Sequence, residues 1–338
     1  ALDAKLVESL AQRIRQVQDD VGRPQSAVPA RSAAPARAGY AEGVAGGHSA
    51  AGGRNPKSAI NWSLKTDRLA LLDVFESKDW KDVDEVVVEI DQDPLPLLQK
   101  KLAALAETAG RDRIRLALPM ITRRWEEDEL LGKIAALRAD GWEKWEAANI
   151  SAWKFLACPV RNPQSAIRNT LSADWSIYVA NRAAALQVTE MGASRFALSP
   201  EDGLANMRSL LAEFGAKATV IVYQDTPLFI AESCVHAISE KGCPGTATCD
   251  FQALDMVSSH GDEVIAVDRR CRTVVVNRRP FCIASRLKEL AEAGAVFLRA
   301  DFVYRPYAPA EVRDLWRALR SGKNLPAGHL GNFERGLL

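Results

Sequence analysis

Eight short apolar segments with the composition of β-strands recur along the chain from residue 62 onward. They lie at 64–69, 85–90, 114–118, 144–149, 175–179, 194–198, 219–223 and 296–301. Stretches with helical spacing of apolar residues separate them, among them 94–108, 127–139, 182–191 and 203–214. Alternating strands and helices predict an α/β fold with a parallel sheet. Eight repeats favour a TIM-like (β/α)8 barrel over an open doubly wound sheet.

The segments before the first predicted strand have a different composition. Residues 1–20 predict an amphipathic helix, with Leu6, Leu10, Ile14 and Val17 at helical spacing. Residues 21–60 are rich in Ala, Gly, Pro, Arg and Ser, and such a stretch predicts a flexible linker. We therefore expect the barrel domain to occupy residues 61–338, and the linker suggests an upstream domain that this chain lacks.

Charge and hydropathy exclude some classes of protein. The net charge of +1 gives no overall electrostatic signal for a nucleic-acid partner. No apolar stretch reaches the roughly 18–20 residues that a membrane-spanning helix needs. The first residues also lack the apolar centre of a signal peptide. Together with unevenly spaced cysteines, this predicts a cytoplasmic, reducing location and a metal site in place of disulfide bonds.

Five of the six cysteines fall within 49 residues, in a segment that interrupts the strand and helix alternation. They are Cys234, Cys243, Cys249, Cys271 and Cys282, and none forms a C-x-x-C pair. Four thiolates from one region are what an iron–sulfur cluster or a zinc ion requires. The sixth, Cys158, stands alone and is expected to be a small core residue.

This cysteine-rich insertion, residues 232–282, lies between the seventh predicted strand and a last helix predicted at 283–293. Within it, 263–267 and 272–276 predict a two-stranded excursion. Loops that follow the strands of a (β/α)8 barrel lie at its catalytic face. The cysteines are therefore expected above the mouth of the barrel.

Several segments resemble peptidase family U32, whose members are called collagenase-like peptidases. The run from Val222 to Cys234 is similar to the family's strand-to-cysteine signature, and 276–283 to a later segment ending in a cysteine. Further similar segments are 180–185, 194–201, 289–301 and 331–336. The resemblance covers roughly residues 62–336, and the combination is more specific than any single segment.

Membership of this family implies a TIM-like barrel and, in its well-understood members, a 4Fe–4S cluster on four cysteines. Those members carry out oxygen-independent hydroxylation of tRNA, ribosomal RNA or the ubiquinone ring, and the RNA-acting ones depend on prephenate. By this resemblance Cys234 and Cys282 match cluster cysteines best, with Cys243 and Cys249 in the region of the middle ligands. Cys271 is kept as an alternative ligand, and zinc as an alternative metal.

The chain departs from the family pattern in three places. Pro227 stands where some members carry a cysteine, and Gln224, Asp225 and Thr226 replace a glycine-containing turn. The family's glycine-rich opening segment is absent. The chain therefore resembles the second half of a larger member.

Polar residues at the predicted strand ends supply further candidates for chemistry at the barrel mouth. Asn181, Tyr223 and Arg299 are the predicted catalytic residues; for each, a structural role is the alternative. The other candidates are Asp67, Arg68, Glu89, Asp91, Arg123, Arg124, Asn149 and Asp301. Arginines at 269–272 and 278–279 could contact phosphate. Trp142, Trp145 and Trp153 are expected to pack in the core instead of stacking on bases.

The leading hypothesis is an iron–sulfur enzyme for oxygen-independent hydroxylation of RNA. A second is proteolysis, as the family name states, although the sequence contains neither a G-x-S-x-G nor an H-E-x-x-H motif. A third is a non-catalytic carboxyl-terminal half that binds RNA or supports the upstream domain.

Overall fold

The computed structural model describes residues 60–156, 170–238, 242, 243, 245, 249 and 253–336. The predicted helix at 1–20 lies outside these residues, as do Cys158 and all of the predicted linker except Ile60.

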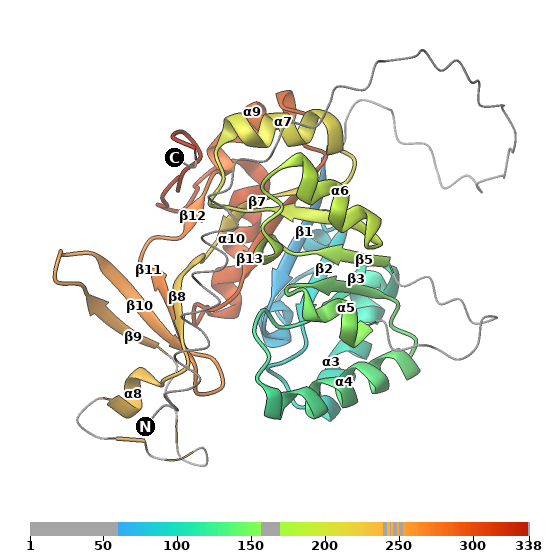
Figure 1. The fold of residues 1–338 in the computed structure, drawn as a ribbon, viewed down its shortest axis with the longest axis vertical. Helices are drawn as coiled ribbons and strands as arrows, with labels where there is room; N and C mark the ends of the chain where they lie inside the picture. The colour runs from blue at the N-terminus through green and yellow to red at the C-terminus, as the bar shows by residue number, and fades with distance from the viewer. Residues whose placement is uncertain are drawn as a thin grey trace, which may run out of the picture. The chain divides into compact units, whose positions relative to one another are not determined.

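Eight parallel strands form a closed barrel, as the sequence predicts (Figure 1). Strands β13, β1, β2, β3, β4, β5 and β6 pair in that order, and β7 pairs with both β13 and β6 to close the ring. The strands are β1 Asn61–Thr66, β2 Glu85–Glu89, β3 Ile114–Ala117, β4 Lys144–Ala147, β5 Thr170–Ala173, β6 Ala193–Leu198, β7 Ala218–Gln224 and β13 Phe297–Phe302.

Helices between the strands bury one apolar stripe each against the outside of the barrel. In α3, Leu98, Leu102 and Leu105 recur at the spacing that places them on one face, and all three are buried. In α10, Trp316 meets Trp62 of β1 edge to face, with ring centroids 5.9 Å apart. The helices are α2 Ser77–Trp80, α3 Leu95–Leu105, α4 Glu127–Ala139, α5 Ser151–Leu156, α6 Arg182–Glu190, α7 Leu204–Phe214, α8 Val235–Ile238, α9 Leu287–Glu292 and α10 Pro309–Ser321.

The prediction of a strand at 175–179 is wrong. The fifth strand is β5, and Trp175–Ile177 form a 3-10 turn that Asp174 begins by accepting a hydrogen bond from the backbone N–H of Trp175. Trp175 and Val179 are buried at this turn. The apolar pattern at 175–179 therefore reflects packing in the core and not pairing in the sheet. The helix predicted at 283–293 is present as α9, but α10 follows it as the last helix.

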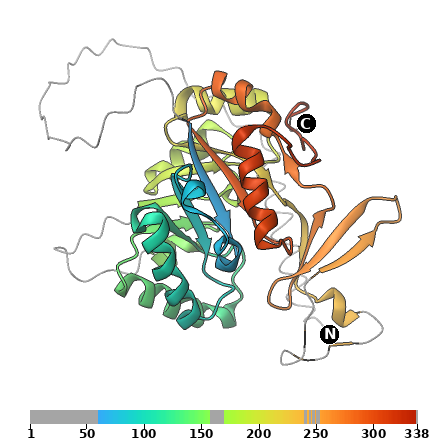
Figure 2. The same ribbon diagram turned by 180° about the vertical axis from the view of Figure 1, so that it is seen from behind.

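The insertion predicted at 232–282 begins earlier, because the preceding residues 227–231 form β8 of a second sheet of four antiparallel strands, in the order β8, β11, β10 and β9 (Figures 1 and 2). They are β8 Pro227–Ala231, β9 Ala253–Val257, β10 Glu263–Asp268 and β11 Thr273–Asn277. The predicted excursion corresponds to β10 and β11, and β8 and β9 extend it. Side chains of β10 and β11 pack on Val303 and Tyr304, which follow β13, and on Met120, which follows β3. This sheet therefore rests on the end of the barrel where the parallel strands finish.

Charged side chains fill much of the barrel interior. The ammonium of Lys65 lies 3.0 Å from Glu146 and 2.6 Å from Asp174. The guanidinium of Arg299 lies 2.9 Å from Glu146 and 2.6 Å from both Asp174 and Asp301. Each of these five side chains is at most 4% exposed. Burial alone lowers the pKa of Lys65, but Asp174, Glu146 and Glu89 outweigh it and hold the pKa well above its usual value.

We expect Lys65→Ala to destabilise the fold by about 3–5 kcal/mol, because it leaves buried carboxylates without their counter-charge. Urea unfolding measures the change, and Lys78→Ala serves as the matched control because that lysine pairs with Glu76 at the surface. A loss for Lys65→Ala no larger than that of the control would contradict the importance of the buried pairs.

Candidate functional site

Residues 269–272 join β10 to β11 at the tip of a hairpin, and we call these four residues the arginine tip. Arg270 and Cys271 form the two-residue turn at its centre. Arg269 and Arg272 exchange backbone hydrogen bonds of 2.8 and 3.2 Å around Arg270 and Cys271. Both central residues have left-handed backbones, with φ of 56° and 62°. This is the geometry of a type I′ turn, which strongly prefers Gly, Asn or Asp. Because Arg and Cys are costly there, their side chains are candidates for a functional role.

Arg269 inserts from the arginine tip into the mouth of the barrel. Its guanidinium forms ion pairs with Asp67, just after β1, and with Glu89 at the end of β2, the latter at 2.7 Å. The same guanidinium lies 5.3 Å from the ring centroid of Tyr304. Burial alone lowers the pKa of Arg269, but Asp67, Glu89 and Asp91 raise it above its usual range. Arg269 thus joins the insertion to the charged interior of the barrel.

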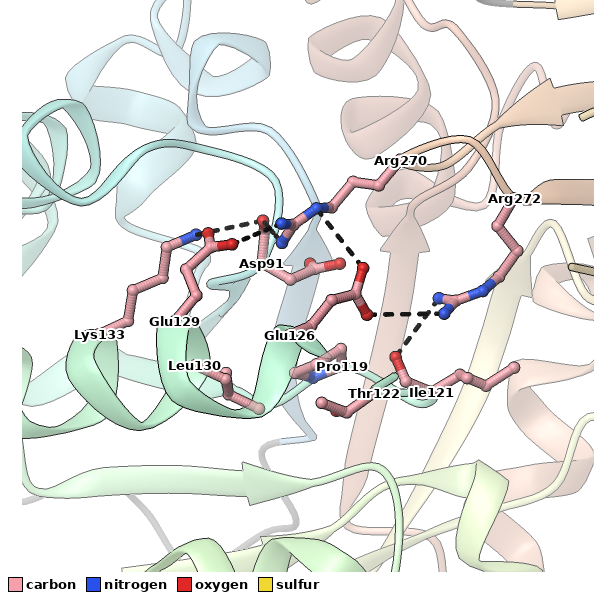
Figure 3. Close-up of a pocket in the computed structure, with 10 residues that line it drawn as sticks. All are labelled: Asp91, Pro119, Ile121, Thr122, Glu126, Glu129, Leu130, Lys133, Arg270 and Arg272. Atoms are coloured by element: carbon pink, nitrogen blue, oxygen red, sulfur yellow. Dashed lines mark hydrogen bonds and ion pairs between the residues drawn. The ribbon is translucent and has the colours of Figure 1, made fainter. Parts of the chain in front are cut away.

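The remaining arginines fix the insertion to the connection between β3 and α4. Glu232, two residues before Cys234, accepts a 2.7 Å hydrogen bond from Arg272 and a 2.6 Å one from Arg123. Arg270 reaches Glu129 of α4 at 2.6 Å. Figure 3 shows Arg270 and Arg272 reaching toward α4 from the opposite side of the pocket. The segment that carries Cys234 and the one that carries Cys271 are therefore held at one place.

Two small adjoining pockets, partly open to solvent, lie beneath the arginine tip. Asp91 and Arg272 line both pockets (Figure 3). Within the described part of the chain, Asp91 Oδ1 and Arg272 Nη2 are buried atoms without a hydrogen-bond partner. Each has an ion-pair partner beyond hydrogen-bond distance: Asp91 Oδ1 lies 3.9 Å from Arg269, and Arg272 Nη2 lies 3.7 Å from Glu126. A small polar ligand that bound here would satisfy the two unmade hydrogen bonds in competition with these ion pairs.

Glu89 lines the inner of these two pockets. Burial, together with the charges of Asp91 and Asp67, raises the pKa of Glu89 to about 7 against the lowering effect of Lys65 and Arg269. A carboxyl group with such a pKa can both accept and donate a proton near neutral pH. Glu89 is therefore the strongest candidate for acid–base chemistry at the mouth.

The insertion brings Cys234, Cys243 and Cys249 within electrostatic range of Cys271. Burial raises the pKa of the Cys271 thiol, and the charges of Asp268, Cys234, Cys243 and Cys249 raise it further. Cys234 is half-buried, and the other three are exposed. Among the described residues, no three or more His, Cys, Asp or Glu side chains are arranged closely enough to hold a metal ion.

Cys282 belongs to a different environment. It lies in β12 Phe281–Cys282, opposite Tyr223 of β7, and is buried. Gly328 packs so closely that a Cβ added there would be 2.7 Å from the Cβ of Cys282. Burial raises the pKa of this thiol and a backbone hydrogen bond from Ala284 lowers it. The structure thus groups Cys271, the alternative ligand of the sequence analysis, with the other three, and places Cys282 in the wall of the barrel.

The three predicted catalytic residues all have structural contacts. Asn181 is the N-cap of α6, where its side-chain oxygen accepts a 2.9 Å hydrogen bond from Ala184 N. Tyr223 packs on Phe302, and its hydroxyl lies 3.0 Å from that of Tyr307. Arg299 directs its guanidinium to buried carboxylates. Asn181 was expected at a strand end because a strand was predicted at 175–179. Since those residues form a turn, Asn181 lies at the start of a helix instead.

The other sequence candidates divide between the mouth and its surroundings. Asp67, Glu89 and Asp91 lie at the mouth, and Asn149 caps the start of α5 by accepting a hydrogen bond from Ser151. Trp142 and Trp145 are buried, as expected, and Trp153 packs against the core. For Arg269 and Arg272 the sequence predicts phosphate contacts only. Nothing in the local sequence indicates that they enter the barrel.

Comparisons with known proteins leave the chain without a family. No protein-family model matches it, and no curated protein matches it. One similar solved structure is the mandelate racemase/muconate lactonizing protein from Herpetosiphon aurantiacus. The identity is 15% and the TM-score 0.32, over 48% of this chain and 47% of that chain. The match spans about half of that protein and is too weak to support an argument, so the barrel assignment rests on the strand pairing.

Within the described ranges, no helix combines the length and the apolar character that crossing a bilayer requires.

We expect Glu89→Gln to change how the free energy of unfolding depends on pH. The pKa of Glu89 is raised on folding, so the native state holds an extra proton between about pH 4.5 and 7, and its stabilising contribution is lost as pH rises. The free energy of unfolding of the wild type minus that of Glu89→Gln should therefore fall by up to about 1.4 kcal/mol for each unit that the pH rises in this window. Urea unfolding at several pH values measures it, with the exposed Glu107→Gln as the control. A pH-independent difference would contradict the raised pKa.

Proposed function

We propose that this chain is an iron–sulfur protein of the U32 type that takes part in oxygen-independent hydroxylation of an RNA base. The observation that carries the proposal is the grouping of four cysteines beside the barrel mouth, together with the sequence resemblance. A barrel whose strand ends carry a titratable carboxyl group, and whose mouth adjoins soft metal ligands, supports chemistry that needs both protons and electrons.

The residues that would hold the cluster are Cys234, Cys243, Cys249 and Cys271. Their side chains would have to come closer together on binding than they lie in the described part of the chain. Their chemistry fits, because thiolates are the ligands of iron–sulfur clusters and a metal stabilises the deprotonated form. Zinc suits the same ligands and remains the alternative. A 4Fe–4S cluster bound there would supply one-electron transfer. In this proposal Cys271 replaces Cys282, whose sulfur is enclosed in the barrel wall.

The barrel residues would bind and orient the reactants. Arg272 Nη2 makes no hydrogen bond and lies 3.7 Å from Glu126, so it would donate to the carboxylate of a small acid such as prephenate. Asp91 Oδ1 would accept from a hydroxyl group. Glu89 would exchange a proton with a group in the inner pocket. Arg269 would hold Glu89 and Asp67 in place through its ion pairs.

We expect Cys271→Gly to lose most of its bound iron and sulfide after anaerobic reconstitution, whereas Cys282→Ala should keep both. Glycine adopts the left-handed backbone of residue 271 without strain, so the variant should be as stable as the metal-free wild type or more stable by about 1 kcal/mol. Iron and sulfide analysis with urea unfolding measures the two effects. The proposed ligand set fails if Cys271→Gly binds as much iron as the wild type.

The reaction itself is tested in RNA from a strain that lacks the protein. Mass spectrometry of its tRNA and ribosomal RNA should show the loss of a modification with the mass of one oxygen atom. The wild-type gene should restore the modification, and the Cys271→Gly gene should not. Unchanged RNA in the deletion strain would contradict RNA hydroxylation, even if the protein binds iron.

A further inference from the structure

Three consecutive loops at the carboxyl-terminal end of the barrel each expose one large apolar side chain. They are Trp125 after β3, Ile150 after β4 and Tyr178 after β5, with exposed fractions of 78%, 61% and 52%. Because β3, β4 and β5 are neighbours in the barrel, these residues form a row, which we call the aromatic rim. A tryptophan in solvent forgoes the stabilisation that burying its large surface would bring.

Trp125 is held out into solvent by a fixed turn. It lies in the 3-10 turn Arg124–Glu126, where Glu126 accepts a 2.9 Å hydrogen bond from the backbone N–H of Arg123. The side chain of Arg123 is in turn bound to Glu232 and Glu126. Its guanidinium lies 5.7 Å from the centroid of the indole ring. The exposure of Trp125 is thus built into the turn.

Tyr178 is also exposed by a constrained backbone. Its φ of 55° is left-handed, which is uncommon for a bulky residue. Trp175, at the start of the same turn, meets the Tyr178 ring edge to face at 6.0 Å and fixes its position. Two separate turns at one end of the barrel therefore present aromatic rings to solvent.

The rim borders the pockets beneath the arginine tip. Glu126, next to Trp125, lines the outer pocket together with Arg270 and Arg272 (Figure 3). Arg124, on the other side of Trp125, is exposed. Trp125 therefore lies between the exposed Arg124 and the acidic residues 126–129, while Arg270 and Arg272 are paired with Glu129 and Glu232.

We propose that the aromatic rim binds a single-stranded segment of RNA by stacking bases on Trp125 and Tyr178, with Arg124 on the phosphate backbone. Unpaired bases offer free π-faces to aromatic side chains, whereas bases in a duplex are already stacked on one another. A strand held in this way presents its next base to the barrel mouth. The choice of RNA as the ligand rests on the proposed function, while the stacking itself rests on the geometry of the rim.

The test is the affinity of the purified full chain for a labelled single-stranded oligouridine. Trp125→Ala should weaken binding about 10- to 100-fold, and Trp125→Phe should retain most of it, because stacking requires a ring. Arg124→Ala should reduce the slope of log affinity against log salt by about 1, whereas Trp125→Ala should leave that slope unchanged. Leu97→Ala, an exposed apolar residue on α3, is the matched control.

The outcomes separate this inference from the proposed reaction. Equal affinity of Trp125→Ala and wild type for the oligouridine would overturn the inference, as would equal binding of duplex and single strand or binding of peptides in place of RNA. Neither result concerns the iron content or the mass of cellular RNA. Binding that depends on Trp125 would support the rim even if the RNA of the deletion strain is unchanged. Thermal unfolding of Trp125→Ala should match the wild type, since the ring is in solvent.

Discussion

The ion pairs between Lys65, Arg299 and their shared carboxylates are the constraint on which the rest of the structure depends. Most barrels of this type fill their interior with branched apolar side chains in layers. Here the middle of the barrel holds two cations against Glu146, Asp174 and Asp301, almost fully excluded from water. Each charge pays a desolvation cost that only its partners can offset. The barrel must therefore close with its strands in one register for the fold to be stable.

Ion pairs also connect the barrel interior to the insertion. Glu89 lies 3.6 Å from Lys65 and 2.7 Å from Arg269, so one carboxyl group links the barrel interior to the arginine tip. Arg270 and Arg272 then connect the tip to α4 and to Glu232. The insertion is consequently attached mainly by charge, with a small apolar contact through Val303, Tyr304 and Met120. Attachment of this kind places Cys234 and Cys271 beside the mouth without burying their thiols.

Sequence reasoning succeeded where one periodicity governs a whole element. Residues 127–139 were predicted as a helix and form α4 with the same ends, and seven of the eight barrel strands overlap their predictions. The fifth failed because Trp175 and Val179 are buried in a turn, while β5 itself has the short sequence TLSA. Helix α10 has the same kind of pattern, because its buried residues Val312, Trp316 and Leu319 recur at helical spacing.

The candidate site was less predictable, because its residues are brought together by long-range contacts. Arg269 reaches Asp67 across about 200 residues of chain, and no local pattern encodes that pair. The sequence resemblance favoured Cys282 over Cys271 as a cluster ligand. In the structure, however, Cys282 lies in β12 in the barrel wall, whereas Cys271 lies in the type I′ turn and is exposed to solvent. A non-glycine pair in such a turn can be recognised only once the hairpin register is known. The cost of holding Arg270 and Cys271 in left-handed backbones is offset in part by the hydrogen bonds that close the turn and by the ion pair of Arg270 with Glu129.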